Sequence, residues 1–319
     1  MPPTLEPCYD QLAFSGSGSD DLVTSKVRRP FHPSSSSASS CLLNVEIFGD
    51  DSNRPFLLFV HGVCESAETW TVQNLARAAQ RNHWRLAVLE LEGHGLSTGK
   101  RSVCGNFSRL IGHAEDFVHH ITSLPEAAEA PFAICGASLG GVLAAYVSDR
   151  IASNPQYKGR FIGAVPIVPA VGVAPEAVPP APIVGALRVL AAVAPSSGFL
   201  TPVEDPSHYA CPSNTKRNFK GSWPLSTSKM LLDVTSGGVE KDLNNGKLKL
   251  DIPSLLVIAG ETDEIIPMEA VESFFMKAKC SDKEMMKVPK GDHGLMVGQK
   301  TAKYATEKIF EWLNDRKDR

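Results

Sequence analysis

The sequence predicts an α/β fold, a mostly parallel sheet with helices on both faces and an inserted cap. Short apolar runs of strand length alternate with segments of helical periodicity along most of the chain. Strands that are apolar throughout are typical of a parallel sheet covered on both faces. The alternation stops near Pro169 and resumes at Ser254, which indicates an insertion into one sheet and not a second independent domain.

The elements follow one another in a regular order. Before the insertion we expect strands at 42–48, 56–60, 86–91, 132–135 and 161–168, and helices at 69–82, at 107–123 and from 138 towards 151. The inserted cap covers about 170–245, is rich in proline and contains one apolar helix at 183–193. After it we expect a strand at 254–259, a helix from 268, a strand at 285–288 and a final helix to about 314.

The segment before the first strand has a different composition. Residues 1–41 are rich in Pro, Ser and Gly and lack periodicity, so we predict a disordered tail followed by one α/β domain, with the cap inserted in it, at 42–319. Residues 25–40 are basic and Ser-rich, like an organellar transit peptide, but four acidic residues precede them. No secretory signal and no apolar run of about 18 residues is found. We therefore expect a cytoplasmic protein, with membrane association left open.

Charge and cysteine content exclude several classes of protein. The formal net charge is −3 and no basic run occurs, which argues against a nucleic-acid partner. The seven cysteines are scattered and form no C-x-x-C pair, so their spacing predicts neither a disulfide framework nor a zinc site, and no metal ligand is assigned. Reduced thiols in a cytosol-like compartment are the simplest interpretation.

The central motif is Gly136-Ala137-Ser138-Leu139-Gly140, which follows a buried strand and opens a helix. This arrangement holds a serine on a sharp turn with its hydroxyl exposed, and the flanking glycines relieve crowding. Ser138 is therefore the predicted nucleophile. The alternative is a small-residue turn used only for packing.

A serine hydroxyl needs a base and an orienting acid, and in this architecture they follow in the order Ser, Asp/Glu, His. Asp263 comes directly after the strand at 254–259, and His293 comes shortly after the strand at 285–288. We predict a Ser138–His293–Asp263 triad. Glu261 remains an alternative acid, and Asp292 is interpreted as a turn residue.

An oxyanion hole requires two backbone N–H groups. One is expected from Leu139, which follows the nucleophile, and the other from Val63 in the loop after the strand at 56–60. His61 and His94 stand at strand ends and are interpreted as structural residues of tight turns.

These motifs together resemble the monoacylglycerol lipase group of α/β-hydrolases over residues 42 to about 315. The resemblance is carried by His-Gly at 61–62, Gly-His-Gly-x-Ser at 93–97, Gly-x-Ser-x-Gly-Gly at 136–141, Gly-x-x-Asp at 260–263 and a late His. It implies the α/β-hydrolase fold and hydrolysis of a fatty-acyl or related small-molecule ester through an acyl-serine, with no cofactor.

The resemblance also implies two residues that contact the glycerol head group, Glu65 and, through a looser alignment, Tyr209. The chain departs from the family pattern at Cys64, Ser66, Ala137 and Met296, so a strict preference for monoacylglycerol does not follow. A carboxylesterase, a peptidase, an acyltransferase and a non-catalytic ligand-binding homologue remain alternatives.

Two further features have two interpretations each. The cap helix at 183–193 is apolar on more than one face, so it either packs on the main domain or lines an acyl channel and makes peripheral contact with membranes, and both can hold. Cys64 beside the oxyanion loop is either a redox-sensitive thiol or a small buried hydrophobe.

Overall fold

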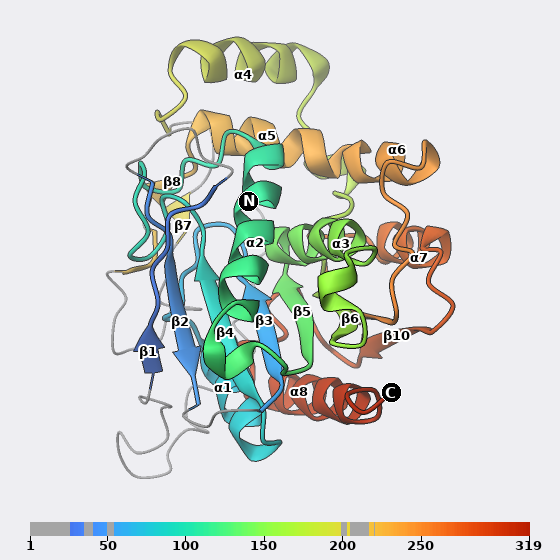
Figure 1. Cartoon of the computed structure of the whole chain (residues 1–319). Coiled ribbons are helices and arrows are strands. Elements are labelled where there is room, and N and C mark those ends of the chain that lie inside the picture. Colours follow the sequence, from blue (N-terminus) through green and yellow to red (C-terminus); the bar gives the residue numbers. More distant parts are fainter. Residues whose placement is uncertain (1–25, 35–40, 50–53, 199–202, 205–216, 220) are drawn as a thin grey trace.

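The computed structural model describes residues 26–34, 41–49, 54–198, 203–204, 217–219 and 221–319. Eight strands form one sheet in the order β1-β2-β4-β3-β5-β6-β9-β10 (Figure 1). Their bounds are β1 (Lys26–Arg28), β2 (Asn44–Phe48), β3 (Phe56–Val60), β4 (Arg85–Glu90), β5 (Phe132–Ala137), β6 (Phe161–Ile167), β9 (Leu255–Gly260) and β10 (Lys283–Val288).

The sheet is mostly parallel, as the sequence predicts. All neighbouring pairs from β4 to β10 run parallel, whereas β1 and β2 are antiparallel to their neighbours. Every residue of β3, β5, β6 and β9 is buried, which explains why these strands are apolar without alternation. The loops after the parallel strands therefore emerge at one edge of the sheet.

Helices cover both faces of the sheet (Figure 1). One hydrophobic core lies between the sheet and the pair α1 and α8, and a second lies between the sheet and α2, α3 and α7. The bounds of these helices are α1 (Trp70–Arg81), α2 (Phe107–Thr122), α3 (Leu139–Ile151), α7 (Met268–Lys277) and α8 (Gln299–Asn314).

The chain leaves the sheet between β6 and β9, over the stretch where the sequence predicts an inserted cap. There it forms α4 (Ala181–Val193), α5 (Leu225–Thr235), α6 (Gly238–Asn244) and a short pair of strands, β7 (Val203–Glu204) and β8 (Gly221–Ser222). Figure 1 shows α4 as the outermost element, lying over α5. Leu187 and Ala191 of α4 are buried against Leu225. In the part of the chain that the structure describes, no helix combines the length and the apolar character needed to cross a bilayer.

The sheet begins earlier than the sequence predicts. Lys26–Arg28 forms β1 and pairs with β2, and Phe31 forms a further bridge to Leu43. The prediction of a disordered tail over 1–41 is therefore wrong for residues 26–34. Lys26 has a specific reason to be ordered, because its ammonium group lies 2.7 Å from the Glu46 carboxylate and 2.6 Å from that of Glu68. Residues 1–25 and 35–40 lie outside the described residues.

Candidate active site

Ser138 stands on a strained turn between β5 and α3. Its φ of 54° and ψ of −117° are a conformation that non-glycine residues rarely adopt. Two backbone hydrogen bonds hold this geometry: Ser138 N–H donates to the carbonyl of Ile167 over 3.0 Å, and Ala170 N–H donates to the carbonyl of Ser138 over 3.1 Å. The turn presents the hydroxyl at the edge of the sheet.

The glycines around Ser138 are required by close backbone contacts. A Cβ atom on Gly136 would lie 2.1 Å from the carbonyl oxygen of Gly140, and one on Gly140 would lie 2.0 Å from that of Val60. Both distances are far inside van der Waals contact, so α3 can approach β3 and β5 this closely only with glycine at both positions.

The structure brings the three side chains of the predicted triad together. His293 Nε2 lies 3.0 Å from Ser138 Oγ, and His293 Nδ1 lies 2.9 Å from Asp263 Oδ2. With its proton on Nδ1, the ring donates to the carboxylate and can accept the serine proton at Nε2. Glu261 and Asp292, the two competing acids, are both exposed.

Asp263 and His293 meet because their loops follow adjacent parallel strands. β9 ends at Gly260 and pairs with β10, which ends at Val288. Thr262 N–H donates to the carbonyl of Gly291 over 2.8 Å and ties the two loops together. The contact is too tight for a side chain at position 260, where a Cβ would lie 2.4 Å from the Gly291 oxygen.

The Asp263 carboxylate is fixed from its far side. Its Oδ1 accepts the backbone N–H groups of Ile265 and Ile266, each over 2.9 Å. The side chain is only 5% exposed, whereas that of His293 is 21% exposed. These two hydrogen bonds orient the carboxylate so that Oδ2 faces His293 Nδ1.

Val63 and Leu139, whose backbone N–H groups are the predicted donors of the oxyanion hole, lie on either side of Ser138. Leu139 is the first residue of α3, where an N–H has no intrahelical acceptor and points towards the positive end of the helix dipole. Val63 and its neighbour Gly62 line the same cavity as Ser138. Both N–H groups are thus in segments that border the nucleophile.

Two buried histidines hold the Val63 loop. His94 Nε2 accepts the N–H of Cys64, next to Val63, over 3.1 Å, and its Nδ1 donates to the carbonyl of Glu92. His61 Nε2 likewise accepts the N–H of Leu91 over 3.1 Å. Burial lowers the pKa of His61 to about 4 and that of His94 to about 3, so both rings are neutral near pH 7.

The two residues assigned to the head group differ in what the structure shows of them. Glu65 lines the cavity, and its Oε2 accepts the N–H of Gly62 over 2.7 Å. Tyr209 lies outside the described residues. Cys64 is fully buried with a φ of 65°, and burial restricts the access of any reagent to its thiol.

A buried charge cluster beneath this loop was not predicted. Arg217, 8% exposed, donates to the carboxylates of Glu46, Glu68 and Glu90 over 2.7 to 2.8 Å. Lys26 completes the cluster through Glu46 and Glu68. The acids lie 127 to 171 residues from Arg217 in sequence, so no local motif reveals the cluster.

Neighbouring contacts connect this charge cluster to the loop. Asn218 accepts the hydroxyl of Ser66 over 2.8 Å, and Phe219 N–H donates to the carbonyl of Cys64 over 3.1 Å. Glu90 also accepts the N–H of Ala67 over 2.9 Å. Residues 217–219 of the insertion thus hold the backbone that carries Val63.

A cavity of about 880 Å³ opens between Ser138 and the cap. Its volume lies within the usual range of small-molecule sites, about 300–1,000 Å³. Ser138 and His293 border it on the sheet side, and most of the remaining wall is apolar. The larger aliphatic and thioether side chains of the lining beyond the Val63 loop are Val168, Val173, Ile183, Leu187, Leu231, Leu232, Ile265, Ile266, Met296 and Val297.

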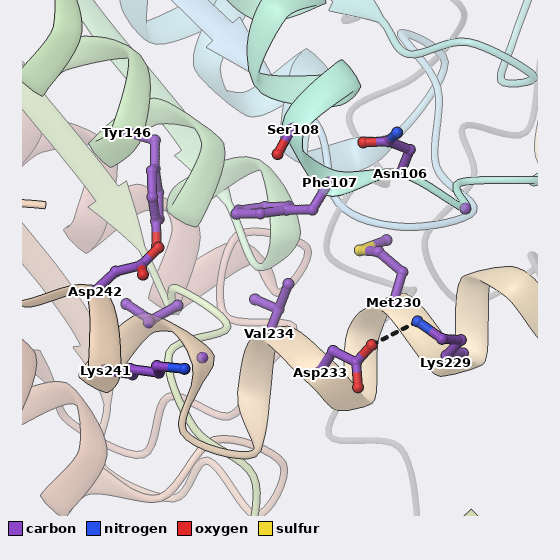
Figure 2. Close-up of a pocket in the computed structure, with 13 residues that line it drawn as sticks. Asn106, Phe107, Ser108, Tyr146, Lys229, Met230, Asp233, Val234, Lys241 and Asp242 are labelled. Atoms are coloured by element: carbon purple, nitrogen blue, oxygen red, sulfur yellow. Dashed lines mark hydrogen bonds and ion pairs between the residues drawn. The ribbon is translucent and has the colours of Figure 1, made fainter. Parts of the chain in front are cut away.

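A second, smaller cavity of about 350 Å³ lies between α2, α3, α5 and α6. Figure 2 shows Phe107 and Tyr146 beside it, with rings 5.3 Å apart and nearly perpendicular. The Tyr146 hydroxyl donates to Asp242, and Lys229 pairs with Asp233 over 2.7 Å. No histidine is among its described lining residues, so a nucleophile there would have no imidazole base.

Solved structures with the same fold include several esterases and lipases. A soluble variant of the Saccharomyces cerevisiae monoglyceride lipase, in complex with a substrate analogue, matches with a TM-score of 0.72 and 16% identity, covering 92% of this chain and 97% of that chain. The Paleococcus ferrophilus monoacylglycerol lipase matches at 0.65 and 19% identity, with coverage of 86% and 99%. A Pyrococcus furiosus esterase matches at 0.60 and 16% identity, with coverage of 95% of both chains.

At these identities the structural matches establish the fold, which is that of the α/β-hydrolases. A search of curated protein sequences finds no match to the chain. The model of one protein family matches residues 51–300, most of the chain. The chain therefore belongs to the Hydrolase_4 family, described as serine aminopeptidase, S33, a family of serine hydrolases on the α/β-hydrolase fold.

Proposed function

We propose that the protein cleaves carboxylic esters through an acyl-serine intermediate, with monoacylglycerol or a related lipid ester as substrate. The observation that carries the proposal is the continuous contact from Ser138 to His293 to Asp263, at 3.0 and 2.9 Å. A hydroxyl, an imidazole and a carboxylate in this order are the components of nucleophilic acyl transfer.

In the first half of the reaction, Ser138 Oγ attacks the ester carbonyl while its proton passes to His293 Nε2. Asp263 stabilises the imidazolium and keeps Nδ1 protonated. The negative charge on the carbonyl oxygen is accepted by the N–H groups of Val63 and Leu139. His293 then gives its proton to the leaving alcohol, and the acyl group remains on Ser138.

In the second half, water replaces the alcohol. His293 Nε2 takes a proton from the water as its oxygen attacks the acyl carbon, and the same two N–H groups hold the new oxyanion. Collapse of this intermediate returns the proton to Ser138 and releases the carboxylic acid. No cofactor takes part.

The walls of the cavity support an apolar acyl group. Ile183 and Leu187 of α4 and Leu231 and Leu232 of α5 face the volume above Ser138, and burying methylene groups against such walls is favourable by about 0.8 kcal/mol each. Glu65 beside Gly62 is the polar side chain proposed for the head group.

Glu65 is also the observation that favours a second candidate, an aminopeptidase. A carboxylate that lines the cavity can bind the α-amino group of a peptide as readily as a glycerol hydroxyl, and the family's description names an aminopeptidase. The apolar remainder of the cavity supports the ester candidate instead.

The outer surface of α4 supports uptake of substrate from a lipid surface. Val189 and Val193 of α4 are 65% and 74% exposed, and the same helix contributes Ile183 and Leu187 to the cavity wall. A helix that is apolar both towards a cavity and towards solvent suits transfer of a lipid between the two.

The test is a substrate panel with Ser138→Ala as the control. Monoacylglycerols of several chain lengths, nitrophenyl esters and aminoacyl amides are compared by kcat/KM. We expect the monoacylglycerols to be cleaved best, and no substrate to be cleaved measurably by the variant. Preferential cleavage of aminoacyl amides would support the second candidate.

A further inference from the structure

A cluster of three side chains with metal-binding chemistry lies outside the active-site cavity. Cys41 precedes β2, Glu92 follows β4, and His113 lies in α2. One ligand atom of each, the sulfur, a carboxylate oxygen and a ring nitrogen, lies within 4.8 Å of the others. Cys41 is 4% exposed and His113 is fully buried.

The topology explains why residues so far apart in sequence meet. β2 runs antiparallel to β4 with Asn44 opposite Glu90, so the residues just before β2 lie beside those just after β4. α2 packs across β4 on the same face, where Leu110, Ile111 and Ala114 belong to the core that also contains Cys41.

The ring of His113 has no hydrogen-bond partner among the described residues. Both of its nitrogens are buried without an acceptor or donor. Its nearest carboxylate oxygen, Glu92 Oε2, is 3.9 Å from Nδ1, which is too long for a hydrogen bond. A buried polar group without a hydrogen-bond partner destabilises the folded state, so we expect a ligand to satisfy the ring nitrogens of His113.

The Glu92 carboxylate is oriented so that one oxygen remains for that occupant. Arg109 Nη2 donates to Glu92 Oε1 over 2.8 Å, and Oε2 faces His113. A hydrogen bond to the outer oxygen of a ligating carboxylate is the usual way in which a protein orients it.

We propose that Cys41, Glu92 and His113 form a binding site for a thiophilic divalent cation of the Zn²⁺ class. Thiolate, imidazole and carboxylate are the donors that Zn²⁺ takes in proteins, and three of them leave a fourth position for water. Thiolate disfavours Mg²⁺ and Ca²⁺, which take oxygen donors.

The geometry requires only small side-chain movements. Zn–N and Zn–S bonds of about 2.1 and 2.3 Å in a tetrahedron place ligand atoms about 3.5 Å apart, compared with 3.9 Å between His113 Nδ1 and Glu92 Oε2 and at most 4.8 Å within the cluster. On binding, the S–H bond of Cys41 breaks, its proton passes to solvent and an S–Zn bond forms, with no change of oxidation state.

The expected consequence is a cross-link between three segments of the fold. The cation joins the start of β2, the loop after β4 and the middle of α2, and a ligand that binds only the folded state stabilises it. Cysteine spacing alone does not indicate this site, because each of the three ligands comes from a different segment.

The experiment uses the full chain after dialysis against a chelator. Zinc chloride is titrated by calorimetry, and cobalt chloride is titrated by absorption, since Co²⁺ bound to thiolate gives a charge-transfer band. We expect one equivalent of zinc per chain, a raised unfolding midpoint and a thiolate–cobalt band.

Two variants test the assignment and one controls for it. Cys41→Ser and His113→Gln should each weaken zinc binding by at least about tenfold and remove the rise in midpoint, and Cys41→Ser should abolish the cobalt band. Cys280→Ser, which changes another buried cysteine 3% exposed, should leave all three readouts unchanged. Circular dichroism of the zinc-free variants checks that each is folded.

Three results would overturn the proposal. The first is the absence of zinc binding to the wild-type chain at millimolar zinc. The second is zinc binding that both variants retain, which places the cation elsewhere. The third is a crystal structure grown with zinc in which an ordered water alone contacts His113.

Discussion

The guanidinium group of Arg217 donates to the carboxylate of Glu90 over 2.7 Å, across 127 positions of sequence and with the acid fully buried. The contact joins the inserted segment to the end of β4. The same guanidinium also contacts Glu46 and Glu68, which Lys26 contacts as well. Loss of the Arg217 charge therefore leaves these buried acids only partly compensated.

Arg217→Met should destabilise the protein strongly. Removing one partner of a buried ion pair leaves uncompensated charge and typically costs about 3–5 kcal/mol. The measurement is urea-induced unfolding. Arg188→Met is the matched control, because Arg188 pairs with Asp233 while 59% exposed, and surface pairs contribute about 0–1 kcal/mol. Equal effects of the two substitutions would contradict the account.

Acid should weaken the contribution of Glu46. Burial alone would raise its pKa, but the charges of Arg217 and Lys26 outweigh burial and hold the pKa below its ordinary value of 4.5. The unfolded state then binds the proton more readily, so the stabilisation is present above pH 4.5 and is lost as pH falls through the lower, folded-state pKa.

The measurement compares the free energy of unfolding of wild type and Glu46→Gln between pH 7 and pH 3. The difference should be largest near pH 7 and should shrink below pH 4.5. Glu307→Gln, at a side chain 60% exposed, should show no such trend. If the difference in the free energy of unfolding between wild type and Glu46→Gln grew on acidification, the predicted pH dependence would be contradicted.

Gly140→Ala should disturb the turn that carries Ser138. The new methyl group would lie 2.0 Å from the carbonyl oxygen of Val60, and overpacking of this kind costs about 1–3 kcal/mol. The midpoint temperature of thermal unfolding and the esterase kcat should both fall. Gly185→Ala is the control, since nothing lies within 4 Å of its Cβ position in α4, and it should raise stability by up to about 1 kcal/mol.

Introducing negative charges on the outer face of α4 should weaken lipid binding without changing the chemical step of ester cleavage at Ser138. Val189→Glu and Val193→Glu change side chains that are 65% and 74% exposed. We expect weaker sedimentation with phospholipid vesicles and slower cleavage of long-chain monoacylglycerol, with short soluble esters cleaved as before. Met276→Glu is the control, because Met276 on α7 is 70% exposed. This variant should change neither vesicle binding nor the cleavage of long-chain monoacylglycerol. Unaltered vesicle binding in both α4 variants would leave α4 with a packing role only.

Much of the fold could be predicted because its signals are local. The buried strands β3 and β5 are apolar along their whole length, and β3 has the bounds predicted for it, Phe56–Val60. Ser138 could be located for the same reason, since strand, glycine, serine and helix follow one another within a few residues. Asp263 and His293 could be placed because each comes soon after a strand of the parallel sheet.

What could not be predicted depends on contacts between distant segments. β1 is held by pairing with β2 and by the two acids around Lys26, and the isolated segment has no strand pattern. α5 begins Leu-Ser-Thr-Ser, residues of mixed helix propensity, and its helicity depends on packing against α4. The roles of Arg217 and His113 could not be predicted either, because their neighbouring side chains are distant in sequence and come close only in the folded chain.

The central claim is that Ser138 is the nucleophile because His293 and Asp263 activate it. The most direct measurement is mass spectrometry of the intact protein and its peptides after reaction with a fluorophosphonate probe. The account predicts a single adduct on Ser138, absent from Ser138→Ala and formed at least about 10³-fold more slowly in His293→Ala. An adduct on a different residue, or reaction of Ser138 at an unchanged rate without His293, would contradict it.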